Sequence, residues 1–461
     1  MKIKKILPIL EWLPNYTTSK FKGDFIAGIT VGIILIPQGI AYALIAGLPP
    51  IYGLYAALVP QLIYAVFGSS RQVAIGPVAM DSLIVAAGVS TLALVGSDSY
   101  IAIAILLALV VGAIQFLMGI FRLGFIVNFL SKPVITGFTS AAALIIGFNQ
   151  FRNLFGVDFV RSNQIQDVIK DIWKNISSLN FNTAVVGVIA IIILLSLRKV
   201  NKKIPSALIV VILGILAIKY LGKNLSDIAI IEEVPSGLPS FSIPEIDFLQ
   251  IKELLPIALT LVLVGFLETI SIGKSLESKQ DEYRIRPNQE LIALGLGNMA
   301  GSLFKAYPTT SSFSRSAINQ ESGGTTGMSA IISVGMVVIT LLFLTPVFYF
   351  LPKTVLAAII IVAVFGLVKV KDAIYLLKTN KLDFSLLLTT FLATLFLGIE
   401  YGIFVGVGMS IIILIFNTSK PYIAVLGAVP DSDFYKNSER FKNVIIEEAV
   451  FVIRFDAQLF F

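Results

Sequence analysis

A polar run of the sequence, YPTTSSFSRSAIN from Tyr307 to Asn319, contains the residue types best suited to binding chemistry. It holds six Ser or Thr residues and one arginine, Arg315, and it lies between two long apolar segments. Pro308 fixes its own φ angle and has no N–H donor, which suits an extended approach to a helix. Ser311 or Ser312 can cap that helix, whose first turn then presents free N–H groups and the positive end of a dipole. With the charge of Arg315, these groups indicate an anion site. A solvated loop of serines with one arginine is the alternative.

The composition places this run in a membrane protein. Of the 461 residues, 56% are hydrophobic and 14% are charged, whereas soluble domains carry about 25% charged residues. The apolar runs are too long and too numerous for a soluble core, so we expect a multi-pass protein in a lipid bilayer. The net charge of +7 does not indicate nucleic-acid binding, because the Lys and Arg residues fall mostly between the apolar segments.

The chain contains no Cys and no His. Disulfides, thiolate chemistry and Cys/His metal centres are therefore excluded. Any proton relay must use Asp, Glu, Lys or Tyr, because the usual side chain that titrates near neutral pH is missing. The sequence also lacks a nucleotide-binding loop and a candidate catalytic triad, so we expect neither an enzyme nor a bound cofactor.

The elements that must position the polar run are about fourteen apolar membrane segments, seven in each half of the chain. Because seven is odd, the second half should be inverted in the membrane relative to the first. The shorter segments are expected to be half-helices or tilted. The predicted segments are Asp24–Ala46, Pro50–Phe67, Pro77–Leu94, Tyr100–Ile120, Phe125–Phe148, Thr183–Leu197 and Pro205–Leu221, then Leu254–Lys274, Gln289–Phe304, Ser312–Asn319, Thr325–Leu351, Lys353–Val368, Phe384–Leu395 and Gly398–Phe416.

The two halves resemble each other at one place. Arg71–Ala79 reads RQVAIGPVA, a short β-like run followed by Gly-Pro and an apolar helix, and Phe304–Ser312 reads FKAYPTTSS before the helix that bears Arg315. In both halves an extended piece with a proline leads into the third segment. Interrupted segments at corresponding positions of two halves are typical of a transporter binding site.

The distribution of basic residues predicts the topology. Clusters such as Lys2–Lys5, Arg198–Lys203 and Lys369–Lys381 lie on one side if the segments alternate, and that side is cytoplasmic by the positive-inside rule. We therefore expect both termini in the cytoplasm and no cleaved signal. The expected domains are a cytoplasmic segment at 1–23, a membrane domain at 24–419 with repeats at about 24–221 and 254–416, and a mixed, soluble segment at 420–461.

Several stretches of the chain resemble the sulfate permease (SulP) family of anion transporters. The longest are IPQGIAYALIAGLPPIYGLYAALVPQLIYAVFGSSRQVAIGPVA, from Ile36 to Ala79, and GNMAGSLFKAYPTTSSFSRSAIN, from Gly297 to Asn319. Shorter matches are Gly124–Phe138, Leu351–Val364 and Arg454–Phe461. The last one is similar to the opening strands of the STAS domain of this family, which would be truncated here.

The resemblance implies an all-α fold of two inverted seven-segment repeats, sorted into a core domain and a gate domain. It also implies transport of a small inorganic or organic anion as the core moves against the gate, in a homodimer within a cell membrane, such as the bacterial inner membrane. Nucleobase–cation symporters share this fold, so the fold alone does not fix the substrate.

The resemblance further implies an anion pocket between the N-termini of the third and tenth segments. Matching motifs assign to it Gln38, Tyr42, Gly76, Pro77, Val78, Ala79, Ser312, Phe313, Ser314 and Arg315. The side-chain chemistry agrees, since amide, hydroxyl and guanidinium groups donate hydrogen bonds to an oxyanion. For the residues of the Gly-Pro turn, packing is an equal alternative.

Glu268 is the most unusual acidic residue, because it lies deep in the apolar run Leu259–Gly273. An ionised carboxylate is unfavourable there, so Glu268 should be protonated, paired or near water. It is the natural carrier of a co-transported H⁺, or of Na⁺ if Thr269 or Ser271 completes an oxygen shell. A structural ion pair or a hydrogen bond to the Ser271 hydroxyl is the alternative. Asp81, in the third segment, replaces a residue that is usually apolar or small in the family, and it would bind a cation or pair with Arg315.

Two other classes of function remain at this stage. A passive channel or an uncoupled exchanger on the same fold would need no carboxylate inside the membrane, so Glu268 favours coupled transport. A nucleobase symporter would need hydrogen-bonding carboxylates for the base and no guanidinium in the tenth segment.

Overall fold

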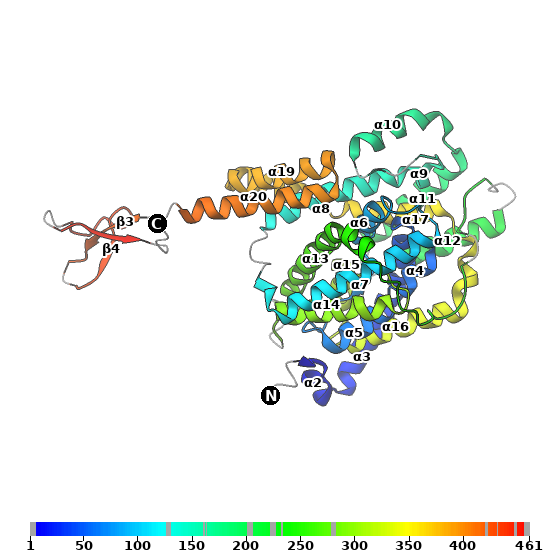
Figure 1. Ribbon diagram of the computed structural model, residues 1–461, viewed down its shortest axis with the longest axis horizontal. Coiled ribbons are helices and arrows are strands. Elements are labelled where there is room, and N and C mark those ends of the chain that lie inside the picture. The colour runs from blue at the N-terminus through cyan, green and yellow to red at the C-terminus, as the bar shows by residue number, and fades with distance from the viewer. Residues whose placement is uncertain are drawn as a thin grey trace.

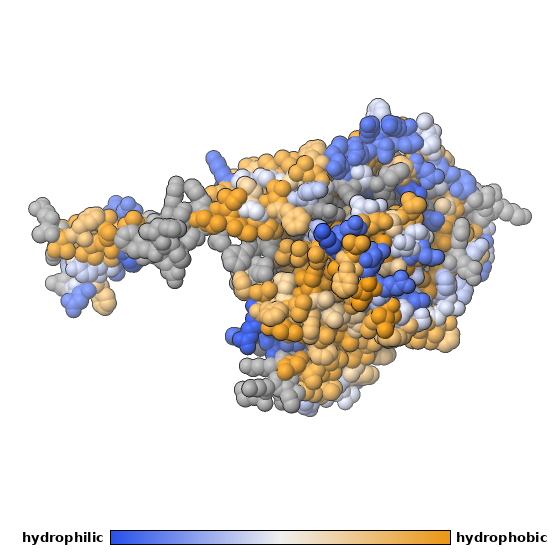
Figure 2. All heavy atoms as spheres, viewed as in Figure 1, coloured by the Kyte–Doolittle hydropathy of each residue, from blue (hydrophilic) through white to orange (hydrophobic). Residues whose placement is uncertain are grey.

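The apolar runs form helices that assemble into one large helical body, which continues through α19 and α20 to a small β-sheet (Figure 1). The computed structural model describes residues 6–125, 131–159, 162, 164–200, 206–221, 227–231, 234–277, 283–419, 423–430, 432–446 and 450–455. Hydrophobic residues dominate the visible face of the helical body, whereas hydrophilic residues gather over α10 (Figure 2). Such an apolar exterior fits a protein that lies in a bilayer.

The first half of the chain is almost entirely helical. Its elements are α2 (Ile9–Trp12), η1 (Leu13–Asn15), α3 (Thr18–Ile45), α4 (Pro50–Tyr55), α5 (Val59–Phe67), β1 (Ile75–Gly76), α6 (Ala79–Val89), α7 (Asp98–Ile120), α8 (Lys132–Asn149), α9 (Phe151–Phe155), α10 (Ile165–Asn175), η3 (Ile176–Ser178), α11 (Phe181–Val200) and α12 (Ser206–Leu221).

The second half has the same character until its last three strands. Its elements are α13 (Phe248–Glu277), α14 (Pro287–Ser302), β2 (Thr310–Ser311), α15 (Phe313–Glu321), α16 (Met328–Ile339), η4 (Thr340–Leu344), η5 (Thr345–Phe350), α17 (Lys353–Phe365), α18 (Val370–Thr379), α19 (Lys381–Leu397), α20 (Ile399–Ser419), β3 (Ile423–Ala428), β4 (Tyr435–Asn437) and β5 (Val452–Phe455).

Each of the fourteen predicted segments overlaps a helix, and the third and tenth are short helices that follow short strands, as expected. Among the described residues, seven helical stretches are long and apolar enough to cross a membrane. The predicted segment Pro50–Phe67 is two helices, because α5 begins anew with Pro60 in its first turn, where a missing N–H is tolerated. The sequence did not predict α10 or α18, which are short polar helices between apolar ones.

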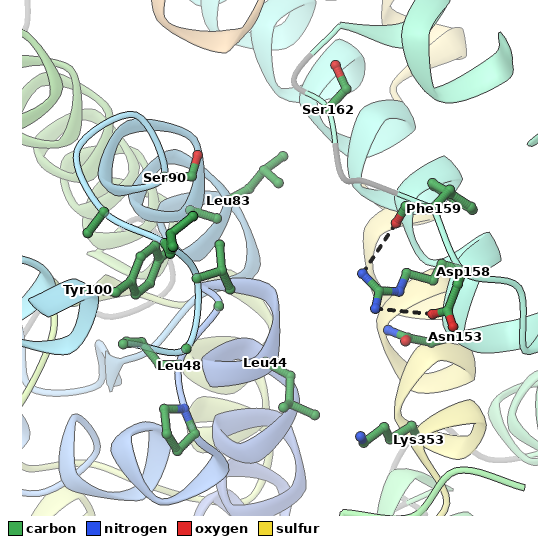
Figure 3. Close-up of a pocket in the computed structure, with 18 residues that line it drawn as sticks. Leu44, Leu48, Leu83, Ser90, Tyr100, Asn153, Asp158, Phe159, Ser162 and Lys353 are labelled. Atoms are coloured by element: carbon green, nitrogen blue, oxygen red, sulfur yellow. Dashed lines mark hydrogen bonds and ion pairs between the residues drawn. The ribbon is translucent and has the colours of Figure 1, made fainter. Parts of the chain in front are cut away.

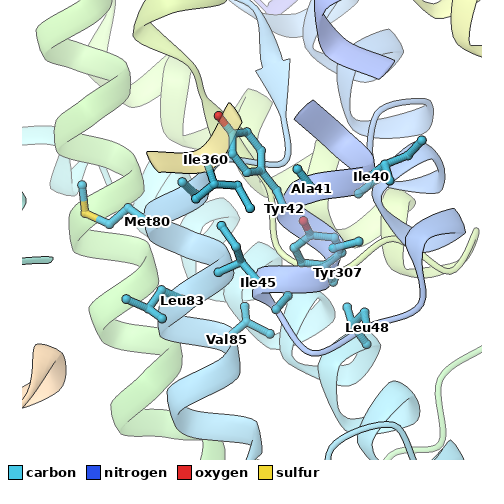
Figure 4. Packing of buried hydrophobic residues seen from close by; sticks show 14 of the residues in the cluster. Ile40, Ala41, Tyr42, Ile45, Leu48, Met80, Leu83, Val85, Tyr307 and Ile360 are labelled. Atoms are coloured by element: carbon cyan, nitrogen blue, oxygen red, sulfur yellow. The ribbon is translucent and has the colours of Figure 1, made fainter. Parts of the chain in front are cut away.

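The packing brings the two halves together along paired helices. α7 lies along α14, α3 along α16 and α8 along α19. Gly112 of α7 and Gly295 of α14 allow a close approach of these two helices, since a Cβ on Gly295 would lie 2.7 Å from the carbonyl oxygen of Gly112. Near the centre of the body, Tyr42, Met80 and Tyr307 pack among buried aliphatic side chains of α3, α6 and α17 (Figure 4). Small residues such as Gly112 and Gly295 are typical of close contacts between membrane helices.

The C-terminal strands form a three-stranded antiparallel sheet in the order β4-β3-β5. The predicted strand Val450–Phe455 is present as β5, whereas Val444–Ile446 makes only an isolated bridge from Ile445 to Ala428. The sequence missed β3, the central strand. Residues 456–461, which end the stretch similar to a STAS domain, lie outside the described residues.

Candidate functional site

The strands β1 and β2 pair with each other and hold the starts of α6 and α15 side by side. They pair antiparallel, with Ile75 opposite Ser311 and Gly76 opposite Thr310. The Ser312 N–H extends this strand pair, because it donates to the Ala74 carbonyl oxygen at 2.9 Å. Because each strand belongs to a different half of the chain, two segments more than two hundred residues apart begin at one place. This juxtaposition confirms the correspondence predicted between the third and tenth segments.

Side chains of α15 fasten that helix to the strand of the other half. The Ser312 hydroxyl accepts from the Arg315 N–H at 3.5 Å and caps the helix, as predicted. The Ser316 hydroxyl accepts from the Ala74 N–H at 2.9 Å, and the Asn319 amide donates to the Gln72 carbonyl oxygen at 2.9 Å. α15 is therefore held on both sides of Arg315, which fixes where its guanidinium lies.

Arg315 is fully buried, at 0% exposure, and is only partly satisfied by the protein. Its Nη1 donates to Gln38 Oε1 at 3.3 Å, but Nε and Nη2 have no hydrogen-bond partner. Within the described residues no carboxylate forms an ion pair with it. A buried charge is unfavourable unless it is paired and hydrogen-bonded. The two bare nitrogens are therefore hydrogen-bond donors that an anionic partner outside the chain could satisfy.

Gly76 provides the wall beside Nη2. A Cβ at this position would lie 3.3 Å from Arg315 Nη2, and the φ angle of +146° disfavours any residue with a side chain. The next residue, Pro77, is buried, and Val78 precedes the first residue of α6, Ala79. No side chain caps α6, so its first turn keeps the free N–H groups that every helix start presents. The Gly-Pro turn thus lies against the Arg315 guanidinium, and this close packing requires a glycine at position 76.

The remaining predicted residues have different environments. Tyr42 is buried, at 6% exposure, and its hydroxyl is close enough to Arg315 for an electrostatic interaction. Gln38 is buried too, and its oxygen is the acceptor used by Arg315. Phe313, at 61% exposure, and Ser314 are exposed. Of the predicted residues, Gln38, Gly76 and Tyr42 therefore lie beside the guanidinium, and Tyr307, which was not assigned to the site, interacts with it as well.

Two carboxylates lie inside the apolar body near the β1–β2 pair. Asp81 of α6 is buried and its Oδ1 has no hydrogen-bond partner. Glu268 of α13 likewise has an Oε2 without a partner, and the two carboxyl groups interact electrostatically. The ion pair considered for Asp81 and Arg315 is wrong, as is the hydrogen bond from Ser271 to Glu268, because neither occurs among the described residues. Both carboxylates remain unneutralised by the protein.

Polar contacts that the sequence did not predict link α13 to the β1–β2 pair. The Thr269 hydroxyl donates to the Gly265 carbonyl oxygen at 2.8 Å and lies 2.9 Å from Ser311 Oγ. The Tyr307 hydroxyl meets Ser82 Oγ at 3.0 Å, which joins the approach to α15 with the first turns of α6. The sequence suggests Thr269 only as a ligand for Na⁺. Its contact with Ser311 of β2 could not be predicted, because the partner lies 42 residues further along the chain.

The described residues hold no group of three or more His, Cys, Asp or Glu side chains that could bind a metal ion. A cation near Glu268 would therefore need carboxylate, hydroxyl and carbonyl oxygens together, the ligands that hard cations prefer.

Comparison with known proteins places this geometry in context. The model of the Sulfate permease family matches residues 21–390. The chain is 41% identical over 468 residues to sulfate transporter 4.1, chloroplastic, of Arabidopsis thaliana, an alignment that covers 100% of this chain and 68% of that protein. It is 36% identical over 473 residues to high affinity sulfate transporter 2 of Stylosanthes hamata, covering 100% of this chain and 71% of the relative.

Solved structures show the same fold. The structure of SLC26A9 matches with a TM-score of 0.90 and 28% identity, over 100% of this chain and 75% of that one. The transmembrane domain of the cyanobacterium bicarbonate transporter BicA matches with a TM-score of 0.74 and 20% identity, over 86% of this chain and 98% of that domain. The predicted all-α architecture is confirmed by these likenesses.

Proposed function

Because the chain belongs to the sulfate permease family, we propose that it is a secondary active transporter that binds a small anion at Arg315. The observation that carries this proposal is the fully buried guanidinium, which has two unpartnered nitrogens and no ion pair with any carboxylate of the described residues. A dianion such as sulfate would accept hydrogen bonds from both nitrogens, and charge-assisted bonds of this kind contribute about 1.5–3 kcal/mol each. The free N–H groups at the starts of α6 and α15 would add to them.

The substrate class is a sulfate-like anion, with bicarbonate and dicarboxylates as the other members considered. Relatives of this chain are named sulfate transporters, and a protein of the same fold is named a bicarbonate transporter. In the proposed mechanism the core domain, which carries α6 and α15, moves against the gate domain and exposes Arg315 to each side of the membrane in turn. Such rocking of one part against another is the common device of repeat-built transporters. A homodimer in a cell membrane with both termini in the cytoplasm completes the proposal.

The driving force is proposed to be H⁺ or Na⁺ bound at Glu268, with Asp81 as the second group. Both carboxylates are unpartnered and interact with each other. Two negative charges in an apolar environment strongly favour uptake of a proton or a cation. A cation bound there also offsets the charge of a dianion while the core moves. This provides a physical reason for the anion and the cation to travel together.

An uncoupled exchanger or channel on the same fold is the alternative, since it too would use Arg315. A nucleobase symporter agrees less well, because its base would meet a buried guanidinium. The distinguishing observation is whether an ion gradient drives accumulation against the anion gradient.

The test is uptake of labelled sulfate, bicarbonate and dicarboxylates into proteoliposomes, with and without a pH or Na⁺ gradient. Glu268→Gln mimics the protonated state, so we expect it to keep anion exchange but lose gradient-driven accumulation. Glu253→Gln is the matched control, because Glu253 is exposed on the same helix. Uphill accumulation by Glu268→Gln would remove Glu268 as the coupling residue and make Asp81 the next one to replace. Failure of the unaltered protein to respond to either gradient would favour the uncoupled exchanger.

A further inference from the structure

A cavity of about 940 Å³ lies between the ends of α3 and α6 on one wall and the α9 region and the start of α17 on the other (Figure 3). We call it the vestibule. It does not include Arg315 or the predicted anion-binding residues. Its lining includes Leu44, Leu83, Arg152, Asp158 and Lys353.

The two walls of the vestibule differ in chemistry. The wall from α3 and α6 is mainly apolar, with Leu44 and Leu83, whereas the opposite wall carries Arg152 and Lys353. The Lys353 ammonium makes no hydrogen bond or ion pair to any described residue, although the residue is only partly exposed. A half-buried, unpaired cation facing a cavity attracts anions from solution.

Arg152 is the second cation on that wall. Its Nη1 donates to the Phe159 carbonyl oxygen at 3.3 Å and its Nη2 lies 3.4 Å from Asp158 Oδ1. The Asp158 side chain is 99% exposed, and ion pairs this exposed contribute little. Asp158 is also the one carboxylate in the vestibule lining, against two cations. The vestibule lining therefore has a net formal charge of +1, and Asp227 lines only the smaller adjoining pocket, which shares both cations.

Two helices, α3 and α6, connect the vestibule lining with the surroundings of Arg315. On α3, Gln38 contacts Arg315 and Leu44 lines the vestibule, which separates them by about 9 Å at the helical rise of about 1.5 Å per residue. On α6, Ala79 starts the helix beside Gly76 and Leu83 lines the vestibule, a separation of about 6 Å by the same rise. Residues of the vestibule lining thus lie one or two helical turns along α3 and α6 from residues at or beside the guanidinium.

We propose that Lys353 and Arg152 form a separate capture site, which holds a small oxyanion such as sulfate in the vestibule before the anion passes to Arg315. This inference rests on the proposed function and adds to it a second, weaker binding step. The capture site acts through its charge and raises the local anion concentration. Its contribution should therefore fall as ionic strength rises, because salt screens charges that water reaches.

The test measures initial rates of sulfate uptake into sealed vesicles whose vestibule faces outward. An introduced Ser99→Cys reports this orientation through an impermeant thiol reagent, since Ser99 is exposed close to the vestibule residue Gly96 and the chain has no other Cys. We expect Lys353→Gln to raise the half-saturating sulfate concentration about three- to tenfold, the low end of electrostatic focusing in clefts. It should also weaken the dependence of uptake on ionic strength, and Lys353→Arg should restore both properties.

Lys219→Gln is the matched control, because Lys219 is an exposed lysine on α12 outside the vestibule lining. A Lys353→Gln protein with the same half-saturation and salt dependence as Lys219→Gln would overturn the capture site. So would a Lys353→Arg protein as impaired as Lys353→Gln, because that result indicates a structural role. Failure of the proposed function looks different: there the unaltered protein itself moves no sulfate.

Discussion

Glu290 and Arg315 are both fully buried charged residues in the second half of the chain, and the protein treats them in opposite ways. The Glu290 carboxylate accepts four hydrogen bonds: from the Tyr64 hydroxyl at 2.5 Å, from the Ser69 N–H and hydroxyl at 2.8 and 2.6 Å, and from the Ser70 N–H at 3.2 Å. Arg315 has one side-chain partner, Gln38, and two bare nitrogens.

The difference separates structural from functional burial of charge. Glu290 ties α14 to the turn that precedes β1, so its burial is fully compensated inside the chain. Asp24 does the same for the loop after α15, since it accepts from Tyr16 and from the N–H and hydroxyl groups of Thr325 and Thr326. Arg315 lies along the chain between α14, which Glu290 anchors, and the loop after α15, which Asp24 anchors. The two unpaired nitrogens of its guanidinium are left for a ligand to satisfy.

The largest expected effect is on folding at Glu290. Glu290→Ala leaves several buried donors without an acceptor, so we expect it to lower the free energy of unfolding by about 3–5 kcal/mol. Arg315→Met removes a charge that the protein does not satisfy, and stability in anion-free buffer should stay the same or rise. Thermal unfolding of both variants in detergent checks the contrast. Equal destabilisation by the two substitutions would show that the two charges do not differ as we describe.

A smaller loss is expected at the second carboxylate. Asp24→Asn turns one acceptor into a donor that faces the N–H groups of Thr325 and Thr326, so we expect a loss of about 1.5–3 kcal/mol in unfolding free energy. Sulfate affinity should change less than it does for substitutions at Arg315, because Asp24 acts on the loop that follows α15. Unfolding and sulfate binding measured on one preparation separate these outcomes; a variant with native stability would contradict the role given to Asp24.

The smallest effect is expected at the wall of the site. In Gly76→Ala the added Cβ would press on Arg315 Nη2, and the alanine would have to keep an unfavourable φ angle. We expect a cost of about 1 kcal/mol, which corresponds to a loss of roughly fivefold in sulfate affinity. Gly335→Ala is the control, because a Cβ there meets nothing within 4 Å. If sulfate affinity is the same in both variants, Gly76 serves only the turn.

Local sequence signals predicted much of this architecture. Proline and serine in YPTTSSFSRSAIN interrupt an apolar pattern, and such interruptions reveal the start of α15 and its cap at Ser312 without any knowledge of the fold. The residues that satisfy buried charges were not predictable in the same way. Glu290 and Ser69 are 221 positions apart, and nothing near either residue announces the partner. For the same reason the sequence suggested Ser271 as the partner of Glu268 from proximity along the chain, whereas no such bond forms.

The contacts of Thr269 illustrate the same limit within the site. Its position one residue from Glu268 suggested a cation ligand, but its hydroxyl is engaged by Ser311 and Gly265. Periodicity places a side chain on a helix face, and only the packing of α13 against β2 decides which group that face meets. Predictions from sequence were therefore reliable for where elements begin and weaker for which polar groups pair.

The most direct test of the central claim is the equilibrium affinity for sulfate of purified Arg315→Ala, measured with labelled sulfate beside the unaltered protein and Arg315→Lys. Because Arg315 offers two nitrogens to the anion, we predict that Arg315→Ala raises the dissociation constant roughly tenfold or more. Arg315→Lys should recover only part of the affinity, since an ammonium lacks the planar fork of a guanidinium. A well-folded Arg315→Ala protein that binds sulfate as tightly as the unaltered chain would contradict the account.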